Sequence, residues 1–128
     1  MGVRDKLHVA VVDDMTTSRA LLTQGLDTLG VRNYSVHNDG VEALNRLTAR
    51  PVHLVISDYN MPGLDGLGLL DELRRHPKTQ KIAFILVTGS PSNDIVARGK
   101  SLRINSIIKK PFTNEQLRDC IEKVVGAL

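Results

Sequence analysis

Four groups of residues in this 128-residue chain could do chemistry, because each directly follows a short apolar run. The groups are Asp13-Asp14, Asp58, Thr88 and Lys110-Pro111. The runs before them are rich in β-branched residues and apolar on both faces, as in buried parallel strands. In an open α/β sheet, functional groups gather just beyond the carboxyl ends of the strands. The sequence therefore predicts that three carboxylates, a hydroxyl and an ammonium meet at one edge of a sheet.

Three carboxylates at one edge repel one another unless a cation joins them, and without a cation at least one pKa must rise. Mg²⁺ suits this set, because it takes oxygen ligands and keeps several waters and a phosphate oxygen; Mn²⁺ is a possible substitute. Zinc is not favoured, since Cys120 is the single cysteine and the histidines lack ligand spacing.

A carboxylate that faces a metal, a hydroxyl and a lysine suits phosphoryl transfer, which chiefly needs alignment and compensation of charge. Lys110 supplies positive charge, and Thr88 supplies a hydrogen bond. A carboxylate can itself be the nucleophile and form an acyl phosphate. Asp58 is the best candidate, because it stands alone after the third strand, whereas Asp13 and Asp14 are paired as metal ligands often are.

Strands and helices alternate along the whole chain, which predicts a doubly wound α/β fold with a five-stranded parallel sheet and five helices. Residues 1–128 then form one domain, since no linker, repeat or low-complexity segment divides them. The expected strands are 7–12, 33–37, 52–57, 82–87 and a short one at 107–108. The expected helices are 16–29, 40–49, 65–75, 94–102 and a last one that follows a capping box at Thr113 and Gln116.

The composition is that of a globular protein outside the membrane, with 41% hydrophobic and 24% charged residues and a formal net charge of +3. Basic residues are dispersed and aromatic residues are few, so neither nucleic acid nor a membrane is an expected partner. Cys120 lies on the apolar stripe of the last helix, which favours a buried, inert thiol. No apolar run suggests a signal peptide or a span, and the cytoplasm is the expected compartment.

The chain resembles the receiver domain of two-component response regulators, particularly the stand-alone CheY-like chemotaxis type. The residues that carry the resemblance are Val55–Gly66 and Lys110–Thr113, together with the acid pair and Thr88 in matching order and spacing. It covers essentially the whole chain. The resemblance implies a flavodoxin/CheY-like fold with strand order 2-1-3-4-5.

The resemblance also implies roles for individual residues. Asp58 would accept a phosphoryl group from a phosphohistidine on a sensor histidine kinase or phosphotransfer domain, in a Mg²⁺-dependent reaction. Asp14 and Asp58 would bind the metal directly, Asp13 largely through water, and Asn60 through its backbone carbonyl. Thr88 would bond a phosphoryl oxygen and Lys110 would pair with it. The Lys110–Pro111 peptide bond would be cis, as is typical of the family.

Gly89 and Ser90 follow Thr88, next to the expected phosphoryl group, where the family prefers a small residue at the first of these positions. Asn60 and Ser90 match positions that tune the access of hydrolytic water; both are small and polar, which predicts a short-lived phosphorylated state. One departure concerns Ile107, three residues before Lys110, where the family commonly has Tyr or Phe. The site does not need that ring, but the output face around the fourth helix and fifth strand must switch differently.

Alternative functions remain open at this stage. A phosphorelay intermediate or a phosphate sink would use the same site as a regulator of the flagellar motor. An aspartate phosphatase of the haloacid dehalogenase type uses similar groups, but it places its nucleophile in a first-strand Asp-x-Asp pattern, and here Asp13 and Asp14 are adjacent. The sequence favours a signalling module that catalyses only its own phosphorylation and dephosphorylation and is not otherwise an enzyme.

Overall fold

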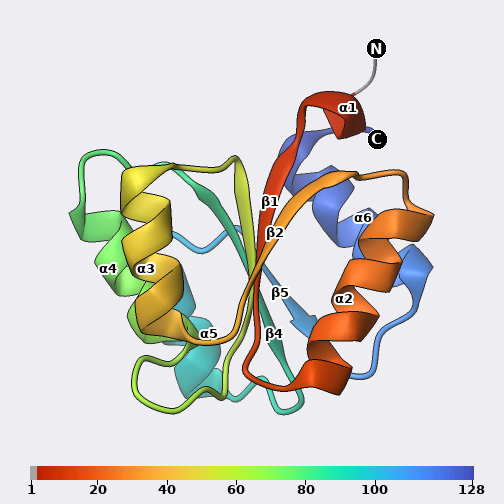
Figure 1. The fold of residues 1–128 in the computed structure, drawn as a ribbon. Helices are drawn as coiled ribbons and strands as arrows, with labels where there is room; N and C mark the ends of the chain where they lie inside the picture. Colours follow the sequence, from red (N-terminus) through yellow and green to blue (C-terminus); the bar gives the residue numbers. More distant parts are fainter. Residues whose placement is uncertain (1–2) are drawn as a thin grey trace.

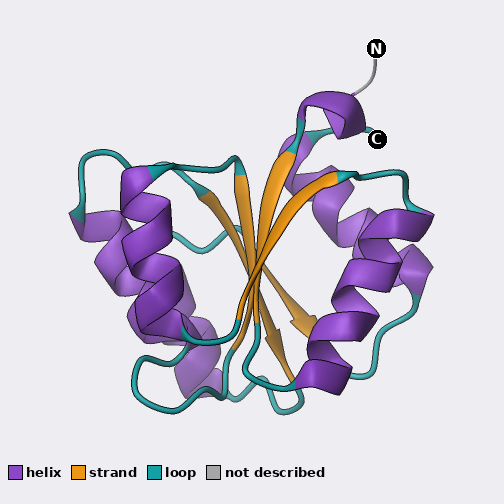
Figure 2. Cartoon of the chain, viewed as in Figure 1, coloured by secondary structure: helices purple, strands orange, loops and turns teal. Residues whose placement is uncertain are grey.

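A computed structural model describes residues 3–128. Its five-stranded sheet is flanked by helices on both faces, as Figures 1 and 2 show. The elements in chain order are α1 (Val3–Lys6), β1 (His8–Val12), α2 (Thr16–Thr28), β2 (Asn33–His37), α3 (Gly40–Ala49), β3 (Leu54–Asp58), α4 (Gly66–Arg75), β4 (Ala83–Thr88), α5 (Asn93–Ser101), β5 (Ser106–Lys109) and α6 (Asn114–Val125). Within this part of the chain, no helix is long and apolar enough to cross a membrane.

All strand pairs are parallel, and the order in the sheet is β2-β1-β3-β4-β5. This confirms the expected strand order and the doubly wound fold. Helices α2 and α6 cover one face, and α3, α4 and α5 cover the other (Figure 1). The structure adds α1, a single turn before β1 that no sequence signal had predicted. Since all five strands run in the same sense, their carboxyl ends share one edge.

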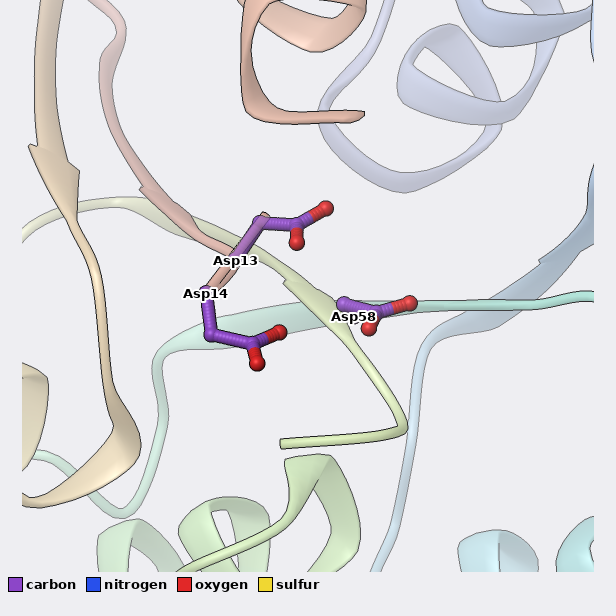
Figure 3. A group of neighbouring side chains, drawn as sticks. All are labelled: Asp13, Asp14 and Asp58. Atoms are coloured by element: carbon purple, nitrogen blue, oxygen red, sulfur yellow. The ribbon is translucent and has the colours of Figure 1, made fainter. Parts of the chain in front are cut away.

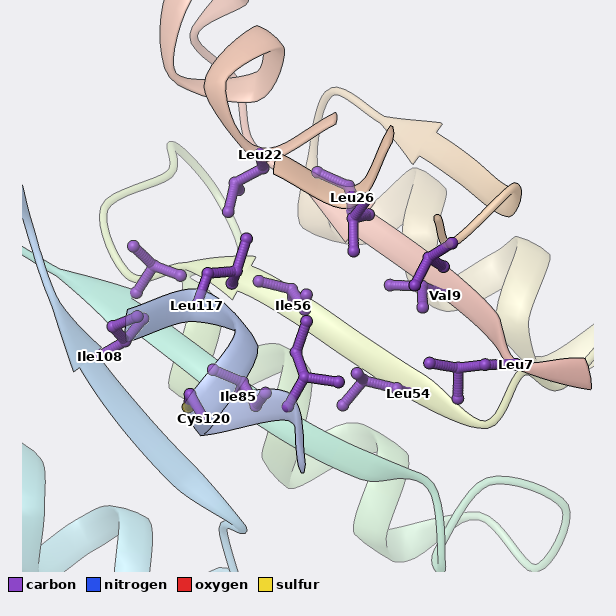
Figure 4. Close-up of a cluster of buried hydrophobic side chains, with 14 residues drawn as sticks. Leu7, Val9, Leu22, Leu26, Leu54, Ile56, Ile85, Ile108, Leu117 and Cys120 are labelled. Carbon is purple, nitrogen blue, oxygen red and sulfur yellow. The ribbon is translucent and has the colours of Figure 1, made fainter. Parts of the chain in front are cut away.

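Two hydrophobic cores hold the sheet between its helical layers. Alternation along β1 sends Val9 (Figure 4) and Val11 into the core beneath α2 and α6, and Ala10 and Val12 into the core beneath α3 and α4. Every residue of β3 is buried as well. The continuous apolar runs of the sequence therefore reflect strands that are covered on both faces.

Helix ends follow the sequence signals closely. The capping box at Thr113 and Gln116 forms with both of its hydrogen bonds, as predicted. Side chains of Asp39 and Asp65 cap α3 and α4 by accepting backbone N–H bonds. After α2, Gly30 has a φ of 82°, a left-handed conformation that glycine adopts without steric cost.

One apolar residue of helix α3 faces solvent. Val41, Leu44 and Leu47 recur at helical spacing along α3, but Val41 is 54% exposed. Its buried stripe is formed by Ala43 and Leu47, with Gly40 packed against the backbone of Leu64. A bulkier residue at the position of Gly40 would clash there, so the helix turns its glycine rather than Val41 toward Leu64, which lies just before α4.

The cysteine prediction is confirmed. Cys120 is 8% exposed and its thiol donates a hydrogen bond to Ser106 Oγ at 3.1 Å. Burial raises the pKa of this thiol, with smaller opposing effects from Ser106 and Lys123. Because reactivity depends on the thiolate, Cys120 is a structural residue of α6 rather than a reactive one.

Gly66 couples the packing of α4 to the site edge, and this gives a stability prediction. A Cβ on Gly66 would lie 2.5 Å from the Asp58 carbonyl oxygen and 2.6 Å from Leu86 Cδ1. We expect Gly66→Ala to lower the free energy of unfolding by about 1–3 kcal/mol in urea, because backbone must move. At Gly89 an added Cβ meets nothing within 4 Å. Gly89→Ala is therefore the matched control, and equal losses in the two variants would contradict the packing argument.

Candidate phosphoryl-transfer site

Three carboxylates meet at the carboxyl edge of the sheet (Figure 3). Asp58 is the last residue of β3, and Asp13 and Asp14 directly follow β1. One oxygen from each of the three lies within 4.8 Å of the others. Asp13 and Asp58 are buried, whereas Asp14 is exposed. The meeting of these acids, predicted from the strand ends, is therefore present in the structure.

One oxygen of the cluster has no hydrogen-bond partner. Asp13 Oδ1 accepts a bond from the Met15 backbone N–H at 3.0 Å, but Asp13 Oδ2 is buried without any partner in the described part of the chain. An unpaired buried carboxylate oxygen is costly. A hard divalent cation would satisfy it, and the donor set, all carboxylate oxygen, fits Mg²⁺. Among residues 3–128 this is the one group of three or more potential ligands, and it contains no histidine or cysteine.

The backbone of Asp13 is held on both sides. Its N–H donates to the His37 carbonyl of β2 at 3.0 Å, and its own carbonyl accepts from Arg19 Nη1 of α2 at 2.9 Å. The sequence reasoning did not single out Arg19. Its spacing from the acid pair forms no distinctive motif. An arginine in the first turn of a surface helix is ordinarily expected to lie in solvent, so the sequence offers no reason to place it at the site.

Lys110 reaches the acids from the other side of the site. Its Nζ lies 2.7 Å from Asp58 Oδ1, while its neighbour Lys109 is exposed, because successive side chains of an extended chain point in opposite directions. The backbone N–H of Lys110 donates to the Thr88 carbonyl at 2.9 Å, and the Lys110–Pro111 bond is cis, as expected. Lys110 is thus tied to β4 by its backbone and to β3 by its side chain.

Opposing effects act on the carboxyl group of Asp58. Burial is the largest and raises its pKa from the ordinary 3.8, and the nearby Asp13 and Asp14 charges raise it further. The hydrogen bond and charge of Lys110 lower the pKa without cancelling the increase. The metal-free site therefore holds a carboxylate whose charge is only partly compensated.

Thr88 ends β4 and is 3% exposed. Its Oγ1 accepts a hydrogen bond from the Ser90 N–H at 3.3 Å, which turns the chain at Gly89. Gly89 and Ser90 are exposed, and the space in front of Gly89 is open. The structure thus places these three residues at the same edge as the acids, with room beside them.

Asn60 lies in the loop after β3, and Ile107 lies within β5. Asn60 is exposed and helps to line a shallow hollow of about 380 Å³ just beyond β3. Ile107, on β5, is partly buried and packs against the core beneath α4 and α5. The position that often carries an aromatic ring is here occupied by an aliphatic side chain of the core.

Comparison with known proteins shows to which protein family this chain belongs. The family model described as the response regulator receiver domain matches residues 9–122. The probable chemotaxis protein CheY of Rhizobium etli is 42% identical over 128 residues, covering 100% of this chain and 99% of the relative. The chemotaxis protein CheY of Pseudomonas aeruginosa is 30% identical over 118 residues, covering 92% and 95%.

Solved structures agree with the sequence relatives. The chemotaxis protein CheY4 of Vibrio cholerae superposes with a TM-score of 0.85 at 25% identity, covering 92% of this chain and 98% of that one. A response regulator from Chloroflexus aurantiacus superposes with a TM-score of 0.82 at 26% identity, covering 93% and 97%. The chain belongs to the response regulator receiver family, a family of signalling modules, and the resemblance read from its motifs is confirmed. The match favours this class over an aspartate phosphatase.

Removing the Asp58 charge should stabilise the metal-free protein. We expect Asp58→Asn to raise the free energy of unfolding by about 1–3 kcal/mol at pH 7 in EDTA. Because the folded-state pKa of Asp58 is raised, the cost of its charge is present above that pKa. The gain of the variant should therefore vanish as the pH falls to about 4. Thermal and urea unfolding at several pH values measure this.

Exposed Asp119 supplies the control for that experiment. Asp119→Asn removes the carboxylate of an exposed residue outside the acid cluster, so it should leave stability unchanged within about 0.5 kcal/mol. Added Mg²⁺ should stabilise the unsubstituted protein and erase most of the difference. A destabilised Asp58→Asn protein at pH 7 would show that the carboxylate is fully compensated without metal.

Proposed function

We propose that this chain is a phosphoryl-accepting response regulator in which Asp58 receives the phosphoryl group of a phosphohistidine. The donor would be a sensor histidine kinase or a phosphotransfer domain. The observation that carries the proposal is the contact of 2.7 Å between Lys110 Nζ and Asp58 Oδ1, beside two further carboxylates. A nucleophilic carboxylate, a lysine and an acidic metal pocket at one sheet edge suit this reaction better than any other.

The acid cluster would hold Mg²⁺, or Mn²⁺ in its place. Asp14 and Asp58 would bind it directly, Asp13 largely through water, and Asn60 through its backbone carbonyl. The unpaired Asp13 Oδ2 supports such a cation. When bound, the metal supplies positive charge to the oxygens of the transferred group.

The protein's own residues would carry the transfer. A carboxylate oxygen of Asp58 attacks phosphorus, and the bond from phosphorus to the donor imidazole nitrogen breaks, leaving the electron pair on that nitrogen. Lys110 moves from the Asp58 carboxylate to a phosphoryl oxygen, which keeps its charge paired throughout. The Thr88 hydroxyl and the backbone N–H groups near Gly89 and Ser90 donate hydrogen bonds to the other oxygens.

Phosphorylation would change the face made by α5 and β5 and so control partner binding. Thr88 ends β4, the neighbour of β5, so a movement of its side chain reaches that face through Ile107. The relatives named as chemotaxis proteins support a role in chemotaxis. The downstream target would be the flagellar motor switch or another protein. We further propose that residues 1–128 form one receiver unit, that it acts in the cytoplasm, and that it catalyses only its own phosphorylation and dephosphorylation.

Phosphorylation by a small-molecule donor tests the central claim. Incubation with acetyl phosphate and Mg²⁺ should add one phosphoryl group, visible as a single mass increase of the intact protein. The increase should be absent in Asp58→Asn and in EDTA, because the nucleophile or the compensating charge is then missing. Asp119→Asn should gain the same mass as the unsubstituted protein. No mass increase in the folded, Mg²⁺-supplied protein would refute the proposal.

The exposure of Asn60 and Ser90 bears on the lifetime of the phosphorylated state. Both side chains are small, polar and open to solvent, so water can approach the acyl phosphate. We expect the phosphoryl group to be lost within seconds to minutes after the donor is removed. The loss can be measured by intact-mass spectrometry of samples quenched at successive times. Substitution of either residue by a bulky apolar one should lengthen the lifetime. A phosphorylated state of the unsubstituted protein that lasts for many hours would contradict this.

A further inference from the structure

Strand β2 is an outermost strand of the sheet (Figure 1). Within residues 3–128, no other strand pairs with its outer side. The His37 carbonyl accepts a bond from the Asp13 N–H, so the backbone groups of His37 point toward β1. Alternation along a parallel ladder gives Ser35 the same direction. Tyr34 and Val36 therefore direct their N–H and C=O groups to the free side, where another extended chain could pair with them.

A groove of about 730 Å³ runs along this free edge. All residues from 32 to 37 line it, together with α3 and the segment that follows α3. Val36, one of its lining residues, is 45% exposed, which is high for a valine in a strand. None of the three site carboxylates lines the groove, so it is separate from the phosphoryl-transfer site.

The groove carries an excess of positive charge. Arg32, Arg46 and Arg50 line it against a single carboxylate, that of Glu42. Both oxygens of Glu42 are engaged, one by His37 Nδ1 at 2.9 Å and one by Arg46 Nε at 3.4 Å. Within residues 3–128 neither Arg32 nor Arg50 forms an ion pair. These guanidinium groups are available to a ligand that brings its own carboxylates.

We propose that this groove binds an extended acidic segment of a partner protein, which adds as a sixth strand beside β2. The free backbone groups of Tyr34 and Val36 require an extended peptide, because a helix satisfies its own backbone bonds. Guanidinium groups pair with carboxylates through two parallel hydrogen bonds, which fits acidic side chains on the added strand. A nucleic acid would meet the arginines but would leave the edge of β2 without a matching ladder.

Peptide titration of the full chain tests the docking surface. The probe is a short, end-capped peptide of alternating glutamate and valine, and its control has lysine in place of glutamate. In ¹H–¹⁵N spectra, the acidic peptide should shift the Tyr34 and Val36 amide signals and slow their hydrogen exchange. The lysine peptide should do neither. Shifts confined to β5 and α6, or equal shifts with both peptides, would overturn the proposal.

Two arginines on different helices form a matched pair of variants. Arg46 is 75% exposed and pairs with Glu42 one turn away on α3, and Arg75 is 72% exposed and pairs with Asp71 in the same way on α4. Arg46→Ala should weaken binding of the acidic peptide about threefold, whereas Arg75→Ala should leave it unchanged. Equal affinities for the two variants would remove the electrostatic argument.

Val36→Pro tests the backbone ladder directly. The Val36 N–H points away from β1, so proline there removes a donor to the added strand but no bond within the sheet. Peptide binding should be lost while circular dichroism shows a folded protein. If this variant does not fold, the Arg46 comparison and the amide shifts of the unsubstituted protein still decide. An oligothymidylate that shifts the same amides with equal affinity would overturn the proposal in favour of nucleic acid.

Discussion

Repulsion among three carboxylates at one edge of the sheet is the constraint on which the rest of the structure depends. Asp13, Asp14 and Asp58 are held within 4.8 Å of one another, and two of them are buried. Such a cluster persists only on a rigid support, because the acids would otherwise separate into water. The support is a pair of central strands, β1 and β3, covered on both faces by apolar side chains. The hydrophobic stability of the two cores therefore offsets the electrostatic cost of a site built to receive charge.

At the opposite ends of the strands, one arginine side chain joins several segments. Arg74, at the end of α4, donates to backbone carbonyls of two segments: those of Gln80 and Ile82 before β4, and those of Leu102 and Arg103 before β5. The beginnings of β4 and β5 are thus fastened to α4 by one side chain. Charge-assisted bonds of this kind are among the stronger ones in proteins. Under the proposed function, a rearrangement on phosphorylation would then be confined to the carboxyl ends of these strands, near Thr88 and Ile107.

These interactions also show which features of the structure can be predicted from the sequence and which cannot. Strand ends, helix caps and the convergence of the acids with Lys110 follow from local patterns and from the common direction of parallel strands. The bonds of Arg19 and Arg74 do not, because a side chain that reaches a backbone carbonyl leaves no trace in residue spacing. The exposure of Val41 was equally hidden, since it depends on how Gly40 meets Leu64 of another element. Spacing thus predicts where groups gather, and contacts between distant segments decide how they are held.

One hydrogen bond joins the acid cluster to the groove beside β2. The Asp13 N–H donates to the His37 carbonyl, and the His37 ring contacts Glu42, which lines the groove with it. A segment docked along β2 and a cation at the acid cluster would therefore act on the two ends of a single short chain of contacts. If docking changes the affinity for the cation, the cation must change the affinity for docking by the same factor. Coupling between the two surfaces would then be measured equally well from either side, and its absence would mean that the β1–β2 ladder is too stiff to transmit it.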